Sequence, residues 1–249
     1  EQYELEQYRK TNRVLDVGCG PAVTLSWLRD RQGWEVFGID PDLFSQRQAR
    51  ERYGISIENG LIHDVSLGEE SVDLIFMDNS LEHTFNPVAT LLEAYRLLRP
   101  GGAFFIFVPN SDGLSTTHLH ANAYWGHWFF YSPRSLVRLL REIGFQIPRF
   151  IAIQNPVNPE LASIGVDPSE HQDDLVVRFD TDPVVAEGVE KRNVLADFFN
   201  LVATKPLDAP VGSPREAELL AIGERSLDER SSALLERRPR TPGHRSSPR

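Results

Sequence analysis

Short apolar runs alternate with amphipathic stretches over residues 1–154. The apolar runs predict buried strands, which we place at 14–17, 35–40, 55–58, 72–77, 103–108 and 145–153. The amphipathic stretches predict helices, one around Leu25 and Leu28 and three more at 44–53, 88–98 and 133–143, the last ended by Gly144. Strands that alternate with helices in this way are typical of a parallel sheet with helices on its faces.

The pattern becomes less regular in the next part of the chain. Residues 155–190 contain several prolines and an acidic cluster, and we expect an irregular insertion there with an edge strand at 175–179. A last strand is predicted at 194–204. One proline followed by two glycines at 100–102 predicts a turn before the fifth strand.

The end of the chain differs in composition from the rest. Residues 208–249 are rich in Pro, Arg and Ser, and predict a flexible tail with one loosely periodic helix at 216–236. We therefore assign residues 1–207 to the folded domain and expect a chain that ends at 207 to fold.

Charge and cysteine content narrow the class of protein. The 249 residues include 36 acidic and 26 basic side chains, a formal net charge of −10, which excludes a generally basic nucleic-acid binder. The single cysteine, Cys19, excludes an intrachain disulfide. No apolar run approaches the roughly 20 residues of a membrane span, and the first residues lack a signal-peptide pattern. We expect a cytoplasmic protein without a membrane-spanning segment.

A glycine-rich turn follows the first predicted strand, where the chain reads Val14-Leu15-Asp16-Val17-Gly18-Cys19-Gly20-Pro21-Ala22. Gly18 and Gly20 lack a Cβ, so the backbone can approach a ligand closely. Asp40 ends the next strand, and a carboxylate there can accept hydrogen bonds from both ribose hydroxyls of an adenosine. The alternatives are a turn without a ligand and, for Asp40, a helix N-cap that it shares with Asp42.

Two classes of adenosine-containing ligand use such a turn. The dinucleotide fingerprint G-x-G-x-x-G has a third glycine, but this chain has Val23 at that position. Asp16 places a negative charge beside the turn, which suits a cation better than a diphosphate. S-adenosylmethionine carries a sulfonium, an ammonium and no phosphate, and it is therefore the predicted ligand.

The chain resembles the class I S-adenosylmethionine-dependent methyltransferases, in the subgroup related to ubiquinone-biosynthesis O-methyltransferases. The resemblance covers residues 12–154 and a last strand. Its motifs are the glycine-rich turn at 16–22 with Ala22 as third small residue, the acidic Asp40, the segment 76–83, and Leu98-Arg99-Pro100-Gly101-Gly102. It implies a Rossmann-like, doubly wound α/β fold with a seven-stranded, mostly parallel sheet whose last strand is antiparallel. It also implies S-adenosyl-L-methionine as cofactor.

The resemblance implies a set of cofactor-binding residues. The predicted set is Asp16, Gly18, Cys19, Gly20, Asp40, Pro41, Leu61, Ile62, Asp78 and Asn79. The family often has an acidic residue at the position of Leu61, so we expect Leu61 and Ile62 to hold the adenine through apolar contact and backbone atoms, with Asp64 as the alternative. Cys19 is expected to be a small loop residue rather than a nucleophile.

His83 is the predicted general base. It follows the fourth predicted strand, at the edge of the sheet where ligands bind in such folds. Imidazole exchanges a proton near neutral pH and can take the proton of a methyl acceptor. The alternative is that His83 caps a helix or packs in the core.

The segment at 79–83 also matches a metal-binding motif in part. Related ubiquinone O-methyltransferases carry E-x-x-E-H and can use a divalent metal, whereas this chain reads Asn79-Ser80-Leu81-Glu82-His83. Because one carboxylate is lost, we favour a site without a metal in which Glu82 orders the loop, and a divalent metal at this segment is the alternative. His118 and His120 offer two further nitrogen ligands, but no third ligand is evident near them.

Histidine and aromatic residues are concentrated at 118–131, after the fifth predicted strand. We predict that this segment forms an acceptor pocket that contains His118, His120, Tyr124, Trp125 and His127. The alternative is that these rings cover the sheet.

The predicted function is methyl transfer from S-adenosylmethionine to a small or lipid-linked metabolite, at oxygen. The rival is a cofactor-binding module without catalysis that acts through a partner. A protein or RNA methyltransferase is disfavoured by the net charge and by the absence of an N-P-P-Y-type tetrapeptide, since the chain reads Asp78-Asn79-Ser80-Leu81 there.

Overall fold

The computed structural model describes residues 5–114, 126–153, 177–191 and 194–222. Within these residues seven strands form one sheet in the order β2-β1-β3-β4-β7-β5-β6. The strands are β1 (Arg13–Val17), β2 (Glu35–Ile39), β3 (Val72–Asp78), β4 (Leu98–Pro109), β5 (Gln146–Ile153), β6 (Val177–Phe179) and β7 (Phe198–Thr204). β1 to β4 pair in parallel, whereas β7 is antiparallel to β4 and β5, and β6 is antiparallel to β5. The predicted fold class is confirmed.

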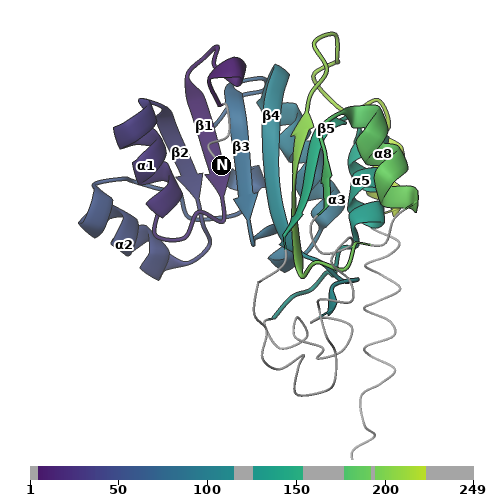
Figure 1. Ribbon diagram of the computed structural model, residues 1–249. Coiled ribbons are helices and arrows are strands. Elements are labelled where there is room, and N and C mark those ends of the chain that lie inside the picture. The colour runs from purple at the N-terminus through teal and green to yellow at the C-terminus, as the bar shows by residue number, and fades with distance from the viewer. Residues whose placement is uncertain (1–4, 115–125, 154–176, 192–193, 223–249) are drawn as a thin grey trace, which may run out of the picture.

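Helices cover both faces of this sheet. They are α1 (Val23–Gln32), α2 (Leu43–Tyr53), α3 (Pro87–Leu97), α5 (Pro133–Ile143) and α8 (Asp182–Lys191), with short 3-10 turns η1 (Leu5–Tyr8), η2 (Ile62–Asp64) and η3 (Leu81–His83). Figure 1 shows α1 and α2 at the β2 end of the sheet, and α3, α5 and α8 at the β5 end. β3 is buried on both sides, because Leu74 packs in the core cluster under α1 and Ile75 in the larger cluster under α3 and α5.

The helix boundaries follow from local chemistry. Asp42 caps α2 by accepting hydrogen bonds from the backbone N–H groups of Phe44 and Ser45, both at 3.0 Å. Ser132 and Pro133 start α5, and Gly144 ends it with a φ of 119°, as its sequence predicts.

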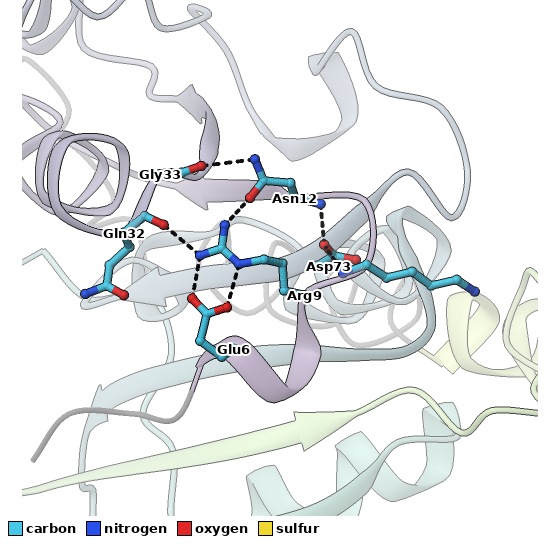
Figure 2. Close-up of polar contacts among 7 residues, drawn as sticks. Glu6, Arg9, Asn12, Gln32, Gly33 and Asp73 are labelled. Atoms are coloured by element: carbon cyan, nitrogen blue, oxygen red, sulfur yellow. Dashed lines mark hydrogen bonds and ion pairs between the residues drawn. The ribbon is translucent and has the colours of Figure 1, made fainter.

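An arginine-centred network fastens the N-terminal segment to the sheet (Figure 2). The Arg9 guanidinium donates to both carboxylate oxygens of Glu6, at 2.9 and 2.6 Å, and to the Gln32 carbonyl at 2.7 Å. It also lies 4.0 Å from the centre of the Trp34 ring, a cation–π distance. These polar contacts add to the apolar contacts of the turn itself, because Leu5 is buried in a core cluster and Tyr8 packs against the same cluster.

Asp73, near the start of β3, holds the same N-terminal segment in place. Its side chain is fully buried and accepts hydrogen bonds from the N–H groups of Lys10, Thr11 and Asn12 at 2.7–2.9 Å, and from Arg99. Burial alone would raise the pKa of Asp73, but the hydrogen bonds and the charge of Arg99 outweigh it and lower that pKa. Asp73 lies near the start of β3, at the edge of the sheet opposite to the site described below.

Two predicted elements near the strand ends are wrong. At 55–58 only Glu58 pairs, in one isolated bridge with Ile39. Ile55 and Ile57 are instead buried in the cluster between α1 and α2, so their alternation reflects helix packing. The turn predicted at 100–102 lies inside β4, where a shift in register against β3 accommodates the glycines.

The predicted irregular insertion at 155–190 contains a helix in its described part. α8 begins at Asp182, and its Val185 and Val189 are buried in the main core. Pro183 follows at the first turn of the helix, where a missing N–H is tolerated, so it does not break the helix. The edge strand is present as β6, and residues 154–176 lie outside the described part of the chain.

Residues after 207 continue to contact the domain. Ser213 Oγ donates to the Ile143 carbonyl at 2.7 Å, and Leu219 is 5% exposed within the main core. Helical residues begin at 216 and reach the end of the described segment at 222. The boundary at 207 stays a prediction, and these contacts argue for a later one.

None of the helices in the described ranges combines the length and the apolar character that crossing a bilayer requires.

Candidate cofactor site

A cavity of about 300 Å³ opens at the edge of the sheet where β1, β2 and β3 end. Its lining consists of Val17, Gly18, Asp40, Pro41, Gly60, Leu61, Ile62, His63, Met77, Asn79, Ser80, His83, Thr84, Phe85, Asn86 and Thr90. Ligands bind at this edge of open α/β sheets, and the volume is at the lower end of the range of small-molecule sites.

The structure brings together most of the predicted cofactor set. Gly18, Asp40, Pro41, Leu61, Ile62 and Asn79 line the cavity. Asp16, Cys19, Gly20 and Asp78 do not line it and lie in the adjoining strand ends and turn.

Gly18 joins the glycine-rich turn to the end of β3. Its φ of 73° is in the left-handed region, and a Cβ added there would lie 2.5 Å from Ser80 Cβ. Ser80 Oγ in turn donates to the Val17 carbonyl at 2.8 Å. Only glycine satisfies both the backbone angle and this close approach.

Asp40 is both a lining residue and a support for the turn. Its Oδ2 accepts from the Gly20 N–H at 2.8 Å, and its Oδ1 accepts from the Asp42 N–H at 2.8 Å. Each carboxylate oxygen has a second lone pair, so Asp40 retains acceptors for a ligand in the cavity. The N-cap of α2 is Asp42 and not Asp40.

A group of carboxylates lies beneath the turn. Burial raises the pKa of Asp16 to about 7, and the negative charges of Asp78 and Asp40 contribute in the same direction. Burial also raises the pKa of Asp78, against a 2.8 Å hydrogen bond from Asn79 Nδ2. A cationic ligand nearby stabilises the ionised form of such carboxylates, which agrees with the argument for a sulfonium over a diphosphate.

Cys19 has a structural role. Its side chain is buried in the cluster with Leu25, Ala49 and Ile57. Burial, followed by the charges of Asp16 and Asp40, raises the pKa of its thiol, so a thiolate is disfavoured. The expectation of a small loop residue fits this environment.

Leu61 and Ile62 contribute apolar side chains to the lining of the cavity. Leu61 is 45% exposed and Ile62 is buried. The carboxylate of Asp64 accepts from the Leu61 N–H at 2.9 Å and holds this turn. Asp64 is not among the lining residues, so its role in the structure is to hold this turn. Its carboxylate also takes up the Leu61 N–H, one of the backbone groups that we expected to contact the adenine.

His83 lines the same cavity from η3. Its Nδ1 lies 3.3 Å from the Gly126 carbonyl, and its ring packs edge-on against His127 with centroids 4.8 Å apart. Burial lowers the pKa of His127, and the neighbouring His83 lowers it further.

Glu82 orders the segment at 126–130 through its backbone, not its carboxylate. Its carbonyl accepts from the N–H groups of Trp128 at 2.9 Å and Phe129 at 3.2 Å. The carboxylate is buried, and burial, with a smaller contribution from the charge of Asp78, raises the pKa of Glu82 to about 7. Glu82, His83 and His127 lie close enough to share one cation, so the predicted absence of a metal stays a prediction that this cluster opposes.

Four residues of the predicted acceptor pocket lie outside the described part of the chain, namely His118, His120, Tyr124 and Trp125.

The structure adds Phe85, which was not predicted from the sequence. Phe85 lines the cavity, and the centre of its ring lies 5.5 Å from the centre of the Trp128 ring. No motif marks Phe85. The Asn86-Pro87 pair beside it is a readable helix start, since Asn86 caps α3 through the Ala89 N–H.

Comparison with known proteins agrees with this geometry. A family model described as a methyltransferase domain matches residues 2–148. A probable S-adenosylmethionine-dependent methyltransferase of Mycolicibacterium smegmatis is 30% identical over 139 residues, covering 54% of this chain and 52% of that protein. The ubiquinone biosynthesis O-methyltransferase of Cereibacter sphaeroides is 28% identical over 162 residues, covering 59% of this chain and 65% of that protein.

The fold is shared more widely than the sequence. The crystal structure of a SAM-dependent methyltransferase from Archaeoglobus fulgidus matches with a TM-score of 0.56 at 17% identity, covering 81% of this chain and 89% of that one. The matched region spans about half the length of the first curated relatives. The family model covers more than half of this chain. The chain therefore belongs to the methyltransferase domain family and has the class I S-adenosylmethionine-dependent methyltransferase fold.

Proposed function

We propose that this domain transfers the methyl group of S-adenosylmethionine to an oxygen atom of a small or lipid-linked metabolite. The observation that carries the proposal is one shared cavity of about 300 Å³ whose lining includes both Asp40 and His83. A cofactor-holding carboxylate and a proton-accepting side chain thus face the same space.

The polar, apolar and charged residues in and beside the cavity indicate how the cofactor is oriented. Asp40 accepts hydrogen bonds from the ribose hydroxyls, and the apolar surface of Leu61 and Ile62 receives the adenine. The buried carboxylates of Asp16 and Asp78 favour the positively charged methionine end near the glycine-rich turn. This arrangement directs the sulfonium toward the end of β3.

The chemistry is a direct substitution at the sulfonium methyl carbon. An acceptor hydroxyl oxygen forms the new C–O bond as the C–S bond breaks, and the electron pair of that bond stays on sulfur as a thioether. The hydroxyl proton passes to an imidazole nitrogen of His83. The protein contributes alignment of the acceptor with the C–S bond and exclusion of water.

The choice of oxygen and of a small acceptor has separate support. The relatives include a ubiquinone biosynthesis O-methyltransferase and an O-methyltransferase of Aspergillus sclerotiorum. A net charge of −10 opposes a phosphate-rich acceptor such as RNA.

Methyl transfer is tested with S-adenosylmethionine labelled at the methyl group and a panel of phenols, catechols, carboxylic acids and amines. The proposal expects label on a hydroxyl oxygen, dependent on Asp40 and lowered about 10²–10⁴-fold in His83→Ala. Label on nitrogen, carbon or RNA contradicts it. Calorimetric binding of S-adenosylmethionine without turnover on any acceptor supports the rival, a binding module that acts through a partner.

A further inference from the structure

Glu82, His83 and His127 form a cluster at the edge of the cavity. Each offers one ligand atom, and these atoms lie within 4.8 Å of one another. Glu82 and His83 come from η3, and His127 comes from the segment after β4. The carbonyl of Glu82 binds the N–H groups of Trp128 and Phe129, which fixes the backbone beside His127.

Several polar atoms of this cluster are buried without a hydrogen bond. Both carboxylate oxygens of Glu82 and Nδ1 of His127 have no partner among the described residues. The nearest approach between the two side chains is 4.0 Å, from Glu82 Oε1 to His127 Nε2, which is too long for a hydrogen bond. A buried polar atom without a hydrogen bond destabilises the fold, so a bound ligand that satisfies these atoms is favoured.

The donor set differs from the oxygen-rich motif of the related ubiquinone enzymes. Asn79 stands in place of the first carboxylate, and its amide nitrogen donates to Asp78 at 2.8 Å. One carboxylate and two imidazoles remain at the cluster. These residues fit a divalent ion, with His127 as the third ligand in place of the lost carboxylate.

We propose that Glu82, His83 and His127 bind one divalent transition-metal ion and select Zn²⁺ or Co²⁺ over Mg²⁺. Two imidazoles with one carboxylate are a ligand set of catalytic zinc sites, which keep a further position for water or substrate. Mg²⁺ requires oxygen ligands in near-octahedral geometry, and this cluster offers one carboxylate.

Neighbouring hydrogen bonds prepare the cluster for this role. Nδ1 of His83 lies 3.3 Å from the Gly126 carbonyl, which can only accept, so this contact assigns the proton to Nδ1 and leaves the lone pair of Nε2 available to bind a metal. The same loop carries Gly126 and His127, so ordering one ligand orders the other.

A metal held by these three residues would polarise an acceptor hydroxyl and lower the pKa of that hydroxyl. His83 is then a ligand, and acts as the general base only in the metal-free protein. Metal binding does not depend on the proposed methyl transfer, and it can be measured without cofactor or acceptor.

The test is titration of the metal-free full chain with Co²⁺, followed by visible absorption. We expect bands of low-coordinate Co²⁺ that one equivalent of Zn²⁺ abolishes and that excess Mg²⁺ leaves in place. Loss of a hydrogen-bond partner of a metal ligand costs roughly 10- to 100-fold in affinity, and loss of a ligand in Glu82→Gln or His127→Ala should cost at least that. Glu51→Gln is the matched control for Glu82→Gln, because Glu51 is exposed on α2, outside the cluster and outside the cavity lining, and this variant should bind Co²⁺ as the unaltered chain does.

A second readout keeps the test independent of folding defects. Zn²⁺ should raise the melting temperature of the unaltered chain and of Glu51→Gln, but not that of His83→Ala or Glu82→Gln. Equal displacement of Co²⁺ by Mg²⁺ would overturn the selectivity. Unchanged Co²⁺ affinity in both Glu82→Gln and His127→Ala would overturn the site, as would the absence of any Co²⁺ spectrum in the unaltered chain.

Discussion

The carboxylate of Asp40 lies 2.8 Å from the backbone nitrogen of Gly20, so the residue that directly follows β2 also holds the turn that follows β1. The same carboxylate lines the cavity. Cofactor contact and shape of the turn therefore depend on one side chain, which makes it the most informative position to change.

Asp40→Ala is expected to weaken binding of S-adenosylhomocysteine. The variant loses a charge-assisted acceptor for the ribose hydroxyls together with the bond that fixes Gly20, at a cost of about 1.5–3 kcal/mol, or roughly 10- to 100-fold in affinity. Isothermal titration calorimetry measures this directly.

Asp42→Ala is the matched control for that change. Asp42 caps α2 but does not line the cavity, so its loss should lower thermal stability and leave affinity unchanged. Equal affinity loss in both variants would show that the effect passes through α2 and not through ribose contact.

Asp73→Ala is expected to destabilise the fold without affecting the cofactor. The change leaves the guanidinium of Arg99 and the N–H groups of Lys10 to Asn12 without their buried acceptor. Breaking a buried, hydrogen-bonded pair costs about 3–5 kcal/mol in the free energy of unfolding. Urea unfolding should report that loss, while calorimetry reports unchanged cofactor affinity because Asp73 lies at the opposite edge of the sheet.

The pH dependence of this contribution has a definite sign. Because the pKa of Asp73 is lowered in the fold, its stabilisation is present above the pKa of the unfolded chain and is lost as pH falls through the folded pKa. Asp30→Ala, which removes an exposed partner of Arg29, is the control and should unfold as the unaltered chain does at each pH. A similar acid sensitivity of Asp73→Ala and the unaltered chain would contradict the assignment.

Periodicity and cap chemistry were sufficient to predict most of the fold. Gly144 predicts the end of α5, and the spacing of Gly18, Gly20 and Asp40 predicts the cofactor turn, because each depends on a local backbone requirement. Residues 55–58 show the limit: buried Ile55 and Ile57 have the alternation of a strand but pack against helices.

The acidic and histidine cluster could not be predicted in the same way. Glu82 and His127 are far apart in sequence and meet only because the segment after β4 returns to the Glu82 carbonyl. No local periodicity reports such a closure. The packing of Leu219 could not be predicted for a related reason. The sequence around it is rich in Pro and Arg, but its own side chain is buried in the main core.

Removal of the residues after 207 is expected to destabilise the domain. Composition predicts that they are dispensable, but Leu219 is 5% exposed in the main core and Ser213 binds the Ile143 carbonyl at 2.7 Å. Loss of one buried leucine side chain costs about 2–5 kcal/mol, so a chain ending at 207 should melt well below one ending at 222.

Point variants distinguish the loss of the buried Leu219 side chain from the shortening of the chain. Leu219→Ala should reproduce much of the loss, whereas Ile222→Ala, at a side chain that is 45% exposed, should change the free energy of unfolding by less than about 0.5 kcal/mol. Equal stability of the chains ending at 207 and 222 would restore the earlier domain boundary.

Asp16→Asn is expected to stabilise the cofactor-free protein above neutral pH. Burial, with the charges of Asp78 and Asp40, raises the pKa of Asp16 from 3.8 to about 7. The folded chain therefore retains a proton that the unfolded chain releases, and stability falls as pH rises from the unfolded pKa through the folded pKa. The difference of about three pKa units corresponds to at most about 4 kcal/mol, reached above the folded pKa.

The neutral amide removes that loss, so the advantage of Asp16→Asn should be near zero at about pH 4 and largest at about pH 8 in urea unfolding. S-adenosylmethionine should reduce the pH dependence of the unaltered chain, because its positive charge stabilises the ionised carboxylate and lowers the pKa of Asp16. Cys19→Ser, a change in the same turn that leaves the charge of Asp16 in place, should keep the pH dependence. A stability advantage of Asp16→Asn that is constant with pH would show that packing, and not ionisation of Asp16, sets its effect.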